Sequence, residues 1–343
     1  MVAGTSSIMG TSHRQPPVRN LVASIQDGLT ELFQLPDGWE IVVGNGGATF
    51  FWDAATFGVI QRQSQHLVFG EFSSKFAQAA ANAPHLDEPM IVTSEPGTHP
   101  TAIGHDGIDL YALTHNETST GVAMELHRPA GADPDALVAV DATSAAGGMT
   151  WNPDEVDIYY FSPQKCFGAD GGVWLAACSP SAVERIEQIA ASDRWRPASL
   201  DLGIALKNSR AHQTYNTPAL ATLIMLDAQV AWLNTHGGLD WAASRCAHSS
   251  SILYDWADAR PWATPFVTNP DHRSSVVVTI DLDDQVHAGD ITTALRANGI
   301  VDIDSYRKLG RNQLRVGTFP SVDPADVEAL TTSIDAVVEM LAN

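Results

Sequence analysis

The sequence has few basic residues, and lysine is the rarest of them. It holds 19 Lys and Arg against 40 Asp and Glu, which gives a formal net charge of −21. A chain with this balance offers no basic stripe to neutralise a phosphate backbone, so nucleic acid is not an expected partner. A solvated acidic surface that keeps the protein in solution is the ordinary explanation of the charge.

Cysteines and long apolar runs are also scarce. Cys166, Cys178 and Cys246 are too few and too far apart for a disulfide framework or a CxxC metal site. No run of eighteen apolar residues is present, and the first twenty residues lack the apolar core of a signal peptide. We therefore expect a cytoplasmic protein that contacts no membrane and holds no metal.

What the chain does contain is a pattern of short β-rich runs and helix-like segments over its first two hundred residues. Several runs are continuously apolar, as strands covered by helices on both faces are. The pattern predicts an α/β fold around a mostly parallel central sheet. Strands are expected at 40–44, 66–70, 90–94, 109–114, 137–143, 157–161 and 172–177, with helices at 48–60 and 73–83.

After residue 217 the pattern changes to that of a smaller α+β unit. Long helical segments are expected at 217–238 and 239–260, then a strand at 274–282, a helix at 288–299, a strand at 313–319 and a closing helix from residue 323. The length of 343 residues suits more than one folding unit. We expect a large domain over 1–240 and a small C-terminal domain over 241–343.

Chemistry in a sheet of this kind lies just beyond the carboxyl ends of the strands. The first strand is followed by 44-GNGGAT-49, where glycines and a helix N-terminus suit a phosphate. The motif lacks the last glycine of GxGxxG and the lysine of a Walker A loop, which argues against a nicotinamide dehydrogenase and a nucleoside-triphosphate site. Taken alone, it is equally well explained as a tight turn.

Two further strand ends carry charged side chains. Asp141 ends an apolar strand, where a buried carboxylate is costly unless a cation meets it, although an Asp that caps the next turn is the simpler explanation. Lys165, one of only four lysines, follows another apolar strand, and a desolvated lysine there can act as an amine nucleophile. Together with the glycine turn that suits a phosphate, these two residues match the three groups through which proteins bind pyridoxal phosphate. These groups are its phosphate, its ring nitrogen and its aldehyde carbon.

The motifs resemble those of the phosphoserine aminotransferase family of class V, fold-type-I enzymes. The likeness runs through 10-GTSHR-14, 44-GNGGAT-49, 115-HNETSTG-121, 141-DATSAAGG-148, 162-SPQK-165, 213-QTYNTPA-219 and 308-KLGRNQLRV-316. It implies a large cofactor-binding domain, pyridoxal 5′-phosphate and a homodimer with shared active sites. It also implies ping-pong amino transfer between glutamate and 3-phosphohydroxypyruvate, in serine synthesis and, in many bacteria, in pyridoxine synthesis.

The resemblance also implies roles for single residues. Lys165 is expected to bind the cofactor as a Schiff base, and Asp141 to keep its ring nitrogen protonated. Other residues expected to contact the cofactor are Gly47, Ala48 and Thr49 at the phosphate, Phe72 stacked on the ring, Thr118 and Gln164, and, from the neighbouring subunit, Asn216 and Thr217. Those expected to bind substrate anions are His13, Arg14 and Arg315. Without the resemblance, Phe72 is explained as a core aromatic, and His13 with Arg14 as a solvated pair.

The chain departs from the family pattern in three places. The usual N-terminal segment before 10-GTSHR-14 is missing, which leaves a truncated, non-catalytic homologue as an alternative. Many members carry Arg near Ala48, so Arg307, Lys308 and Arg311 are expected to supply positive charge instead. Cys166 stands where many members have Asn. Another class V enzyme that acts on a phosphate-free keto acid such as glyoxylate also remains open, whereas a cysteine desulfurase is disfavoured because Cys178 and Cys246 lie in a strand and a helix.

Overall fold

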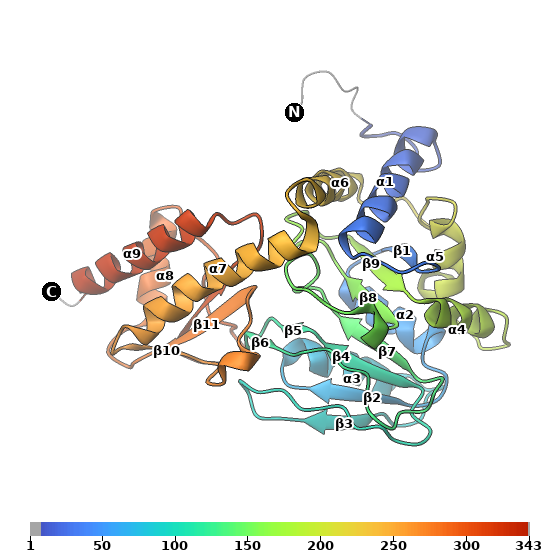
Figure 1. Ribbon diagram of the computed structural model, residues 1–343, viewed down its shortest axis with the longest axis horizontal. Coiled ribbons are helices and arrows are strands. Elements are labelled where there is room, and N and C mark those ends of the chain that lie inside the picture. The colour runs from blue at the N-terminus through green and yellow to red at the C-terminus, as the bar shows by residue number, and fades with distance from the viewer. Residues whose placement is uncertain (1–7, 342–343) are drawn as a thin grey trace.

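The computed structural model describes residues 8–341, which form a larger part around a central sheet and a smaller C-terminal part (Figure 1). The central sheet has seven strands, and only β9 runs antiparallel to its neighbours. Across the sheet the order is β1 (Glu40–Asn45), β9 (Val173–Cys178), β8 (Ile158–Phe161), β7 (Leu137–Asp141), β4 (Leu110–Thr114), β2 (Ser64–Val68) and β3 (Met90–Thr93). The seven predicted strands and the α/β class are confirmed.

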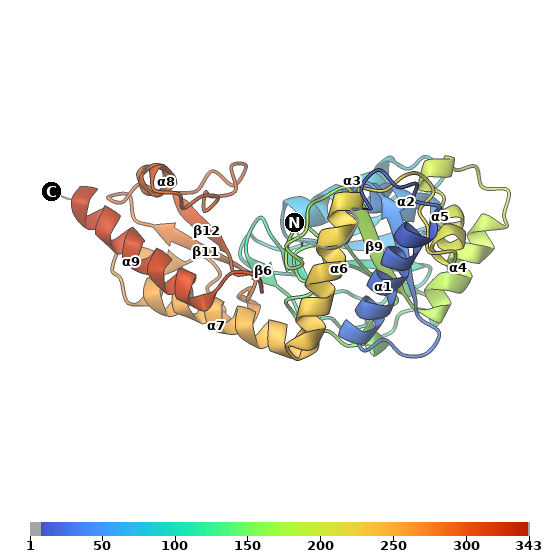
Figure 2. The ribbon, with the colours of Figure 1, turned by 90° about the horizontal axis from the view of Figure 1, so that it is seen from above.

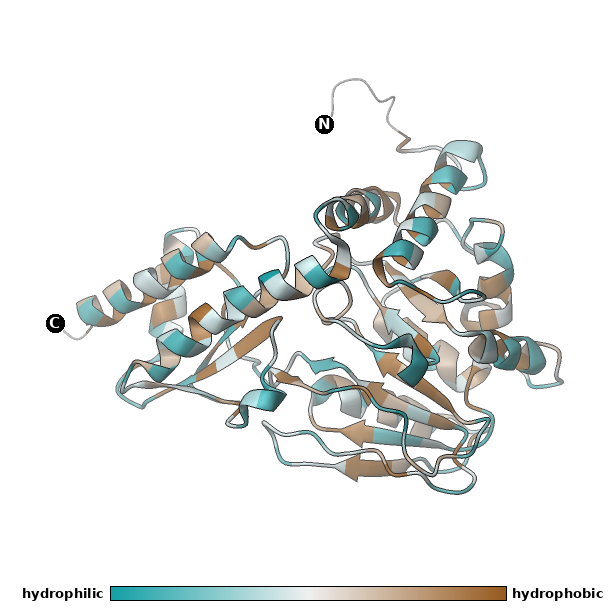
Figure 3. Ribbon diagram, in the orientation of Figure 1, coloured by the Kyte–Doolittle hydropathy of each residue, from teal (hydrophilic) through white to brown (hydrophobic). Residues whose placement is uncertain are grey.

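Helices cover both faces of this sheet, which explains the continuously apolar strands. In β8, Tyr159 and Phe161 point into one core, and Ile158 and Tyr160 point into the other. The first core is covered by α1 (Pro16–Leu32) and α6 (Leu220–Thr235), and the second by α2 (Ala48–Gly58), α3 (Glu71–Asn82), α4 (Pro180–Ala190) and α5 (Leu202–Ser209). Figure 3 shows largely brown strands between helices that carry both brown and teal residues.

The exception among these helices is α6, which carries apolar residues all round its axis. Its inner side packs on α1, but Ile224 and Met225 on its outer side are exposed. A helix that is apolar all round is normally buried. Even so, none of the helices within residues 8–341 combines the length and apolar character needed to cross a membrane.

The smaller part is an α+β unit, as expected. Its antiparallel sheet has the order β10 (Ala263–Pro265), β11 (Val277–Leu282) and β12 (Gln313–Gly317), and it packs with α7 (Gly238–Asp258), α8 (Ala288–Ala297) and α9 (Pro324–Leu341). Helix α7 joins the two parts (Figure 2). Leu239 and Ala242 pack into the core of the larger part, and Leu253 into that of the smaller part. The domain boundary at residue 240 stays a prediction, and α7 runs across it.

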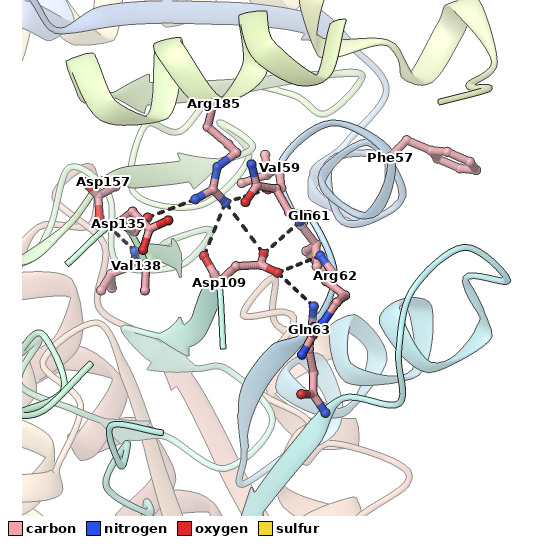
Figure 4. Close-up of polar contacts among 12 residues, drawn as sticks. Phe57, Val59, Gln61, Arg62, Gln63, Asp109, Asp135, Val138, Asp157 and Arg185 are labelled. Carbon is pink, nitrogen blue, oxygen red and sulfur yellow. Dashed lines mark hydrogen bonds and ion pairs between the residues drawn. The ribbon is translucent and has the colours of Figure 1, made fainter. Parts of the chain in front are cut away.

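The amino ends of β2, β4 and β7 are tied together by Arg185 of α4 (Figure 4). This buried guanidinium donates to the carbonyl oxygens of Val59, Asp109 and Asp135, at 3.2, 3.4 and 2.9 Å. The Asp109 carboxylate lies 3.6 Å from it and accepts the backbone amides of residues 61–63. A cavity of about 510 Å³ lies beside Arg185. It lies at the amino end of the sheet, opposite the strand ends where ligands bind in such folds.

Candidate active site

Three of the predicted site segments meet at the carboxyl edge of the sheet. Asp141 ends β7, the segment leading to Lys165 follows β8, and Gly47 follows β1. A Cβ atom added to Gly47 would lie 3.8 Å from Ser162 Oγ, so the glycine turn lies beside the segment that carries the lysine. Trp52 of α2 donates a hydrogen bond to the Asp141 carboxylate, so the helix after the glycine turn is also joined to the end of β7.

The Asp141 carboxylate is buried and lacks a cationic partner among residues 8–341. It accepts the indole N–H of Trp52 at 3.0 Å and the amide of Thr143 at 3.0 Å. Burial raises the pKa of Asp141; the hydrogen bonds from Thr143 and Trp52 oppose the shift, and the charge of Glu117 adds to it. A protonated ring nitrogen placed against this carboxylate would supply the missing positive charge.

Lys165 is half-buried in the turn between β8 and β9. Burial lowers the pKa of its amine, and the positive charge of Arg315 lowers it further. The next residue, Cys166, is fully buried, and its thiol donates to the carbonyl oxygen of Ser144 at 3.2 Å. Cys166 thus ties the lysine turn to the segment after β7, which gives this departure from the family pattern a structural role.

The N-terminus of α2 is open to an anion. Its N-cap is Gly47, which has no side chain to accept a hydrogen bond, and the amides of Ala48 and Thr49 have no acceptor within the described part of the chain. Gly46, with φ of 98°, has the left-handed conformation that glycine readily adopts. Free amides and the positive end of the helix dipole suit a phosphate group.

Comparison with known proteins gives the family. A family model described as aminotransferase class-V matches residues 93–303. The chain is 58% identical to the phosphoserine aminotransferase of Rhodococcus jostii over 98% of the chain and 90% of that protein. It is 57% identical to that of Corynebacterium glutamicum over 99% of the chain and 90% of the relative. The chain belongs to the phosphoserine aminotransferase family of class-V aminotransferases.

Solved structures agree with the fold. A phosphoserine aminotransferase from Cytophaga hutchinsonii superposes with a TM-score of 0.88 at 21% identity, over 96% of this chain and 91% of that one. A phosphoserine aminotransferase from Trichomonas vaginalis, solved with PLP bound, superposes with a TM-score of 0.80 at 18% identity, over 97% and 92% of the two chains. Class-V aminotransferases use pyridoxal 5′-phosphate. Lys165, Asp141 and the open N-terminus of α2 fit the aldehyde, the ring nitrogen and the phosphate of that cofactor.

Three further residues expected to contact the cofactor come from segments beside this centre. Phe72 is half-buried at the start of α3, with its ring centroid 6.0 Å from that of Tyr306. Thr118 follows β4, and its hydroxyl donates to Ser144 Oγ at 2.8 Å. Gln164 is exposed beside Lys165. Their contacts with the cofactor stay predictions.

Residues matched to the neighbouring subunit's cofactor lie together at the end of β1. The side-chain amide of Asn45 donates to the carbonyl oxygens of Asn216 and Thr217, at 3.2 Å each. Thr217 Oγ1 lies 3.2 Å from His13 Nδ1, and burial followed by the charge of Arg14 lowers the pKa of His13. The N-terminal segment and residues 216–217 thus form one exposed unit beside the glycine turn.

Of the cations matched to substrate anions, Arg315 is close enough to Lys165 for its charge to lower the pKa of that amine. It donates to the carbonyl oxygen of Thr118 at 3.4 Å and lies over the ring of Tyr306. The expected compensating charges are partly engaged elsewhere, because Lys308 pairs with Glu71 and Arg311 with Asp281. No ion pair joins Arg307 to another residue within 8–341.

Sequence reasoning missed three residues that support the centre. The sequence predicts Trp52 only as part of a helix, and Ser144 and Glu117 occur only within family motifs. Ser144 Oγ accepts hydrogen bonds from the side chains of Asn116 and Thr118. The sequence does show polar side chains beside the ends of apolar strands, and such side chains need hydrogen-bond partners when they are buried. It does not show which residues those partners are.

Proposed function

We propose that this chain transfers an amino group between glutamate and 3-phosphohydroxypyruvate, giving 2-oxoglutarate and O-phosphoserine. The observation that carries the proposal is the meeting of a lysine with a lowered pKa, a buried acid and an open helix N-terminus at one sheet edge. The high identity to named phosphoserine aminotransferases supports the substrate pair. The reaction belongs to serine synthesis and, by the resemblance, to pyridoxine synthesis in many bacteria; the expected compartment is the cytoplasm.

The residues of the centre would hold the cofactor at three points. The amides of Ala48 and Thr49 would bind its phosphate, Asp141 would hold the proton on its ring nitrogen, and Lys165 Nζ would bind its aldehyde carbon. When bound, pyridoxal phosphate supplies the carbon that carries the amino group and a ring that delocalises the electrons of the broken Cα–H bond. Phe72 packs against that ring.

Lys165 then moves the proton. The amine of Lys165 would take the α-proton of the amino-acid substrate and hold it at Nζ, and it would return a proton to the α-carbon when the keto acid reacts. A lowered pKa favours the neutral amine that this step needs. Asp141 keeps its negative charge against the ring nitrogen throughout.

Cations bind the ends of the substrates. The guanidinium of Arg315 has the planar fork that suits a carboxylate, and its place beside Thr118 puts it next to the ring. His13 and Arg14 are assigned to the second anion of the substrate, which is a carboxylate in glutamate and a phosphate in the keto acid. Arg307 has no ion pair within 8–341 and is a further candidate for that anion.

A homodimer completes the proposal. Phe50 and Tyr215, both more than 40% exposed, line a cavity of about 150 Å³ beside the glycine turn, and Ile224 and Met225 are exposed on α6. Apolar side chains exposed together next to a site favour coverage by a partner surface. A second copy would cover them and bring its own Asn216 and Thr217 to the cofactor phosphate.

The test is an amino-transfer assay with glutamate and 3-phosphohydroxypyruvate, together with the Lys165→Ala variant. Borohydride treatment of the yellow wild-type protein should fix the cofactor to the peptide that contains Lys165, and the variant should release the cofactor on dialysis. Lys207→Ala, at an exposed lysine of α5, serves as the control. Faster turnover of glyoxylate would contradict the substrate assignment, and failure to bind the cofactor would favour the non-catalytic homologue.

A further inference from the structure

Glu117 is a fully buried carboxylate to which the proposed mechanism gives no task. It ends the short strand β5 (Asn116–Glu117), which pairs with β6 (Val122–Ala123), and none of its side chain reaches solvent. It makes no ion pair with any residue from 8 to 341. Burying a carboxylate without a cation is costly unless hydrogen bonds replace its water.

Hydrogen-bond donors surround the Glu117 carboxylate. The amides of Phe72 and Ser73 donate to Oε2 at 3.1 and 2.9 Å, and the Ser73 hydroxyl donates at 2.9 Å. On Oε1, the hydroxyl and the amide of Ser119 donate at 2.7 and 3.2 Å. All of these groups donate hydrogen bonds, as the oxygen atoms of a carboxylate anion require.

The same turn binds the remaining free amide at the start of α3. Ser119 Oγ accepts the amide of Glu71 at 3.0 Å. The first three amides of the helix are therefore all held by residues 117 and 119. Gly70 makes the approach possible, because a Cβ atom there would lie 2.3 Å from Glu117 Cγ. Glu117 thus fixes the backbone of Phe72 at the point where α3 begins.

We propose that Glu117 is a positioning residue that sets the place of the Phe72 ring against the cofactor by holding the first turn of α3 through its backbone amides. The inference rests on the proposed function in one respect, the assignment of Phe72 to the cofactor ring. A merely structural acid would stabilise the fold without any coupling to Phe72. Glu117 and Phe72 should instead act as a pair.

The first experiment is hydrogen–deuterium exchange of the cofactor-loaded protein carrying Glu117→Gln. Glutamine keeps the shape but turns a donor toward the backbone amides, so exchange of residues 71–74 should be about tenfold faster than in the wild type. Glu155→Gln is the matched control, because Glu155 also accepts a backbone amide, that of Arg128, away from the centre. Unchanged exchange at 71–74 in Glu117→Gln would overturn the inference.

The second experiment is a double-mutant cycle of Glu117→Gln with Phe72→Leu, read out as the cofactor dissociation constant and the visible circular dichroism of the bound cofactor. Each single change should weaken binding roughly tenfold, and the pair should cost clearly less than the product. Additive effects would overturn this inference alone. A Phe72→Leu protein with unchanged affinity and dichroism would overturn the role of Phe72 and this inference together.

A milder variant covers the case in which Glu117→Gln fails to fold. Ser119→Ala removes the hydroxyl that donates to Glu117 and accepts the amide of Glu71, and leaves the carboxylate in place. It should speed exchange at residues 71–74 and weaken cofactor binding by a smaller factor in the same assays. Wild-type exchange and affinity in this variant would count against the proposal.

Discussion

Asp141 shows how a single residue is placed for chemistry at the expense of stability. Its carboxylate is buried against Trp52 and the amide of Thr143, and burial raises its pKa. A group whose pKa is higher in the folded than in the unfolded chain lowers the stability of the fold as pH rises above its unfolded pKa. Without cofactor, this acid therefore destabilises the protein at neutral pH.

Asp141→Asn should accordingly separate activity from stability. The turnover number should fall by about a hundredfold, because the ring nitrogen loses its anionic partner. After removal of the cofactor, the melting temperature at pH 7 should equal or exceed that of the wild type, since an amide is cheaper to bury than a carboxylate. Turnover and thermal unfolding measure the two effects. A variant that is active but much less stable would contradict the proposed role.

Two buried histidines predict a loss of stability in acid. Burial lowers the pKa of His66 to about 3 and that of His115 to about 4. The unfolded chain binds their protons first as pH falls below about 6.5, so the free energy of unfolding should fall from there toward pH 4, by about 1.4 kcal/mol per pH unit for each residue. His66→Gln should remove about half of this histidine contribution, as measured by urea denaturation. An unchanged slope would refute the assignment.

Single site residues differ in how far the sequence predicts them. Lys165 and Asp141 could be singled out because a charged side chain at the end of an apolar strand is conspicuous. Glu117 could not be given a role, because its partners Phe72 and Ser73 lie far from it in the chain and meet it only when α3 packs beside β5. A residue with an expected role in ligand binding is easier to single out in the sequence than a residue that holds other residues in place.

At the scale of elements, two neighbouring helices begin at the same sheet edge with different electrostatics. The start of α3 is closed by the charge of Glu117 and by Ser119, whereas the start of α2 keeps free amides at Ala48 and Thr49. Because a carboxylate repels other anions, we expect a phosphate to bind at the start of α2 and not at that of α3. The difference between the two helices depends on Gly70, because a residue with a side chain at this position would leave no room for the Glu117 carboxylate.

Gly70→Ala should therefore be costly. Its Cβ atom would lie 2.3 Å from Glu117 Cγ, and we expect a loss of about 2 kcal/mol in the free energy of unfolding together with weaker cofactor binding. Gly289→Ala in α8 is the control, because a Cβ atom there meets nothing, and it should stabilise the protein by about 0.5 kcal/mol. Denaturant unfolding of both variants measures the contrast. Equal effects would contradict the steric explanation.

The elements themselves were largely predictable. All seven central strands appear close to their expected bounds because each is a short apolar run, and helices α2, α3 and α6–α9 follow the predicted segments. Helices α1, α4 and α5 and the short strands β5, β6 and β10 lie outside the predicted segments. A strand of two residues such as β5 has no periodicity to read, and its existence depends on its partner.

At the scale of the whole molecule, the exposed apolar side chains of α6 predict the assembly. Replacing Ile224 and Met225 together by Asp should convert the expected dimer to a monomer in sedimentation and lower activity, because Asn216 and Thr217 would no longer reach a neighbouring site. Ile103→Asp, a single change of the same kind at an exposed isoleucine near β2, is the control. A wild type that sediments as a monomer would refute the dimer itself.

The order of strands in the central sheet also bears on how the protein folds. β8 and β9 are adjacent both in sequence and in space, so the turn with Lys165 closes a short loop and can form early. β1 pairs only with β9, with Glu40 opposite Cys178, and this contact must wait until most of the sheet has been synthesised. The glycine turn after β1, where we expect the cofactor phosphate to bind, is thus completed only after β9 has joined the sheet, and capture of that phosphate would follow this step.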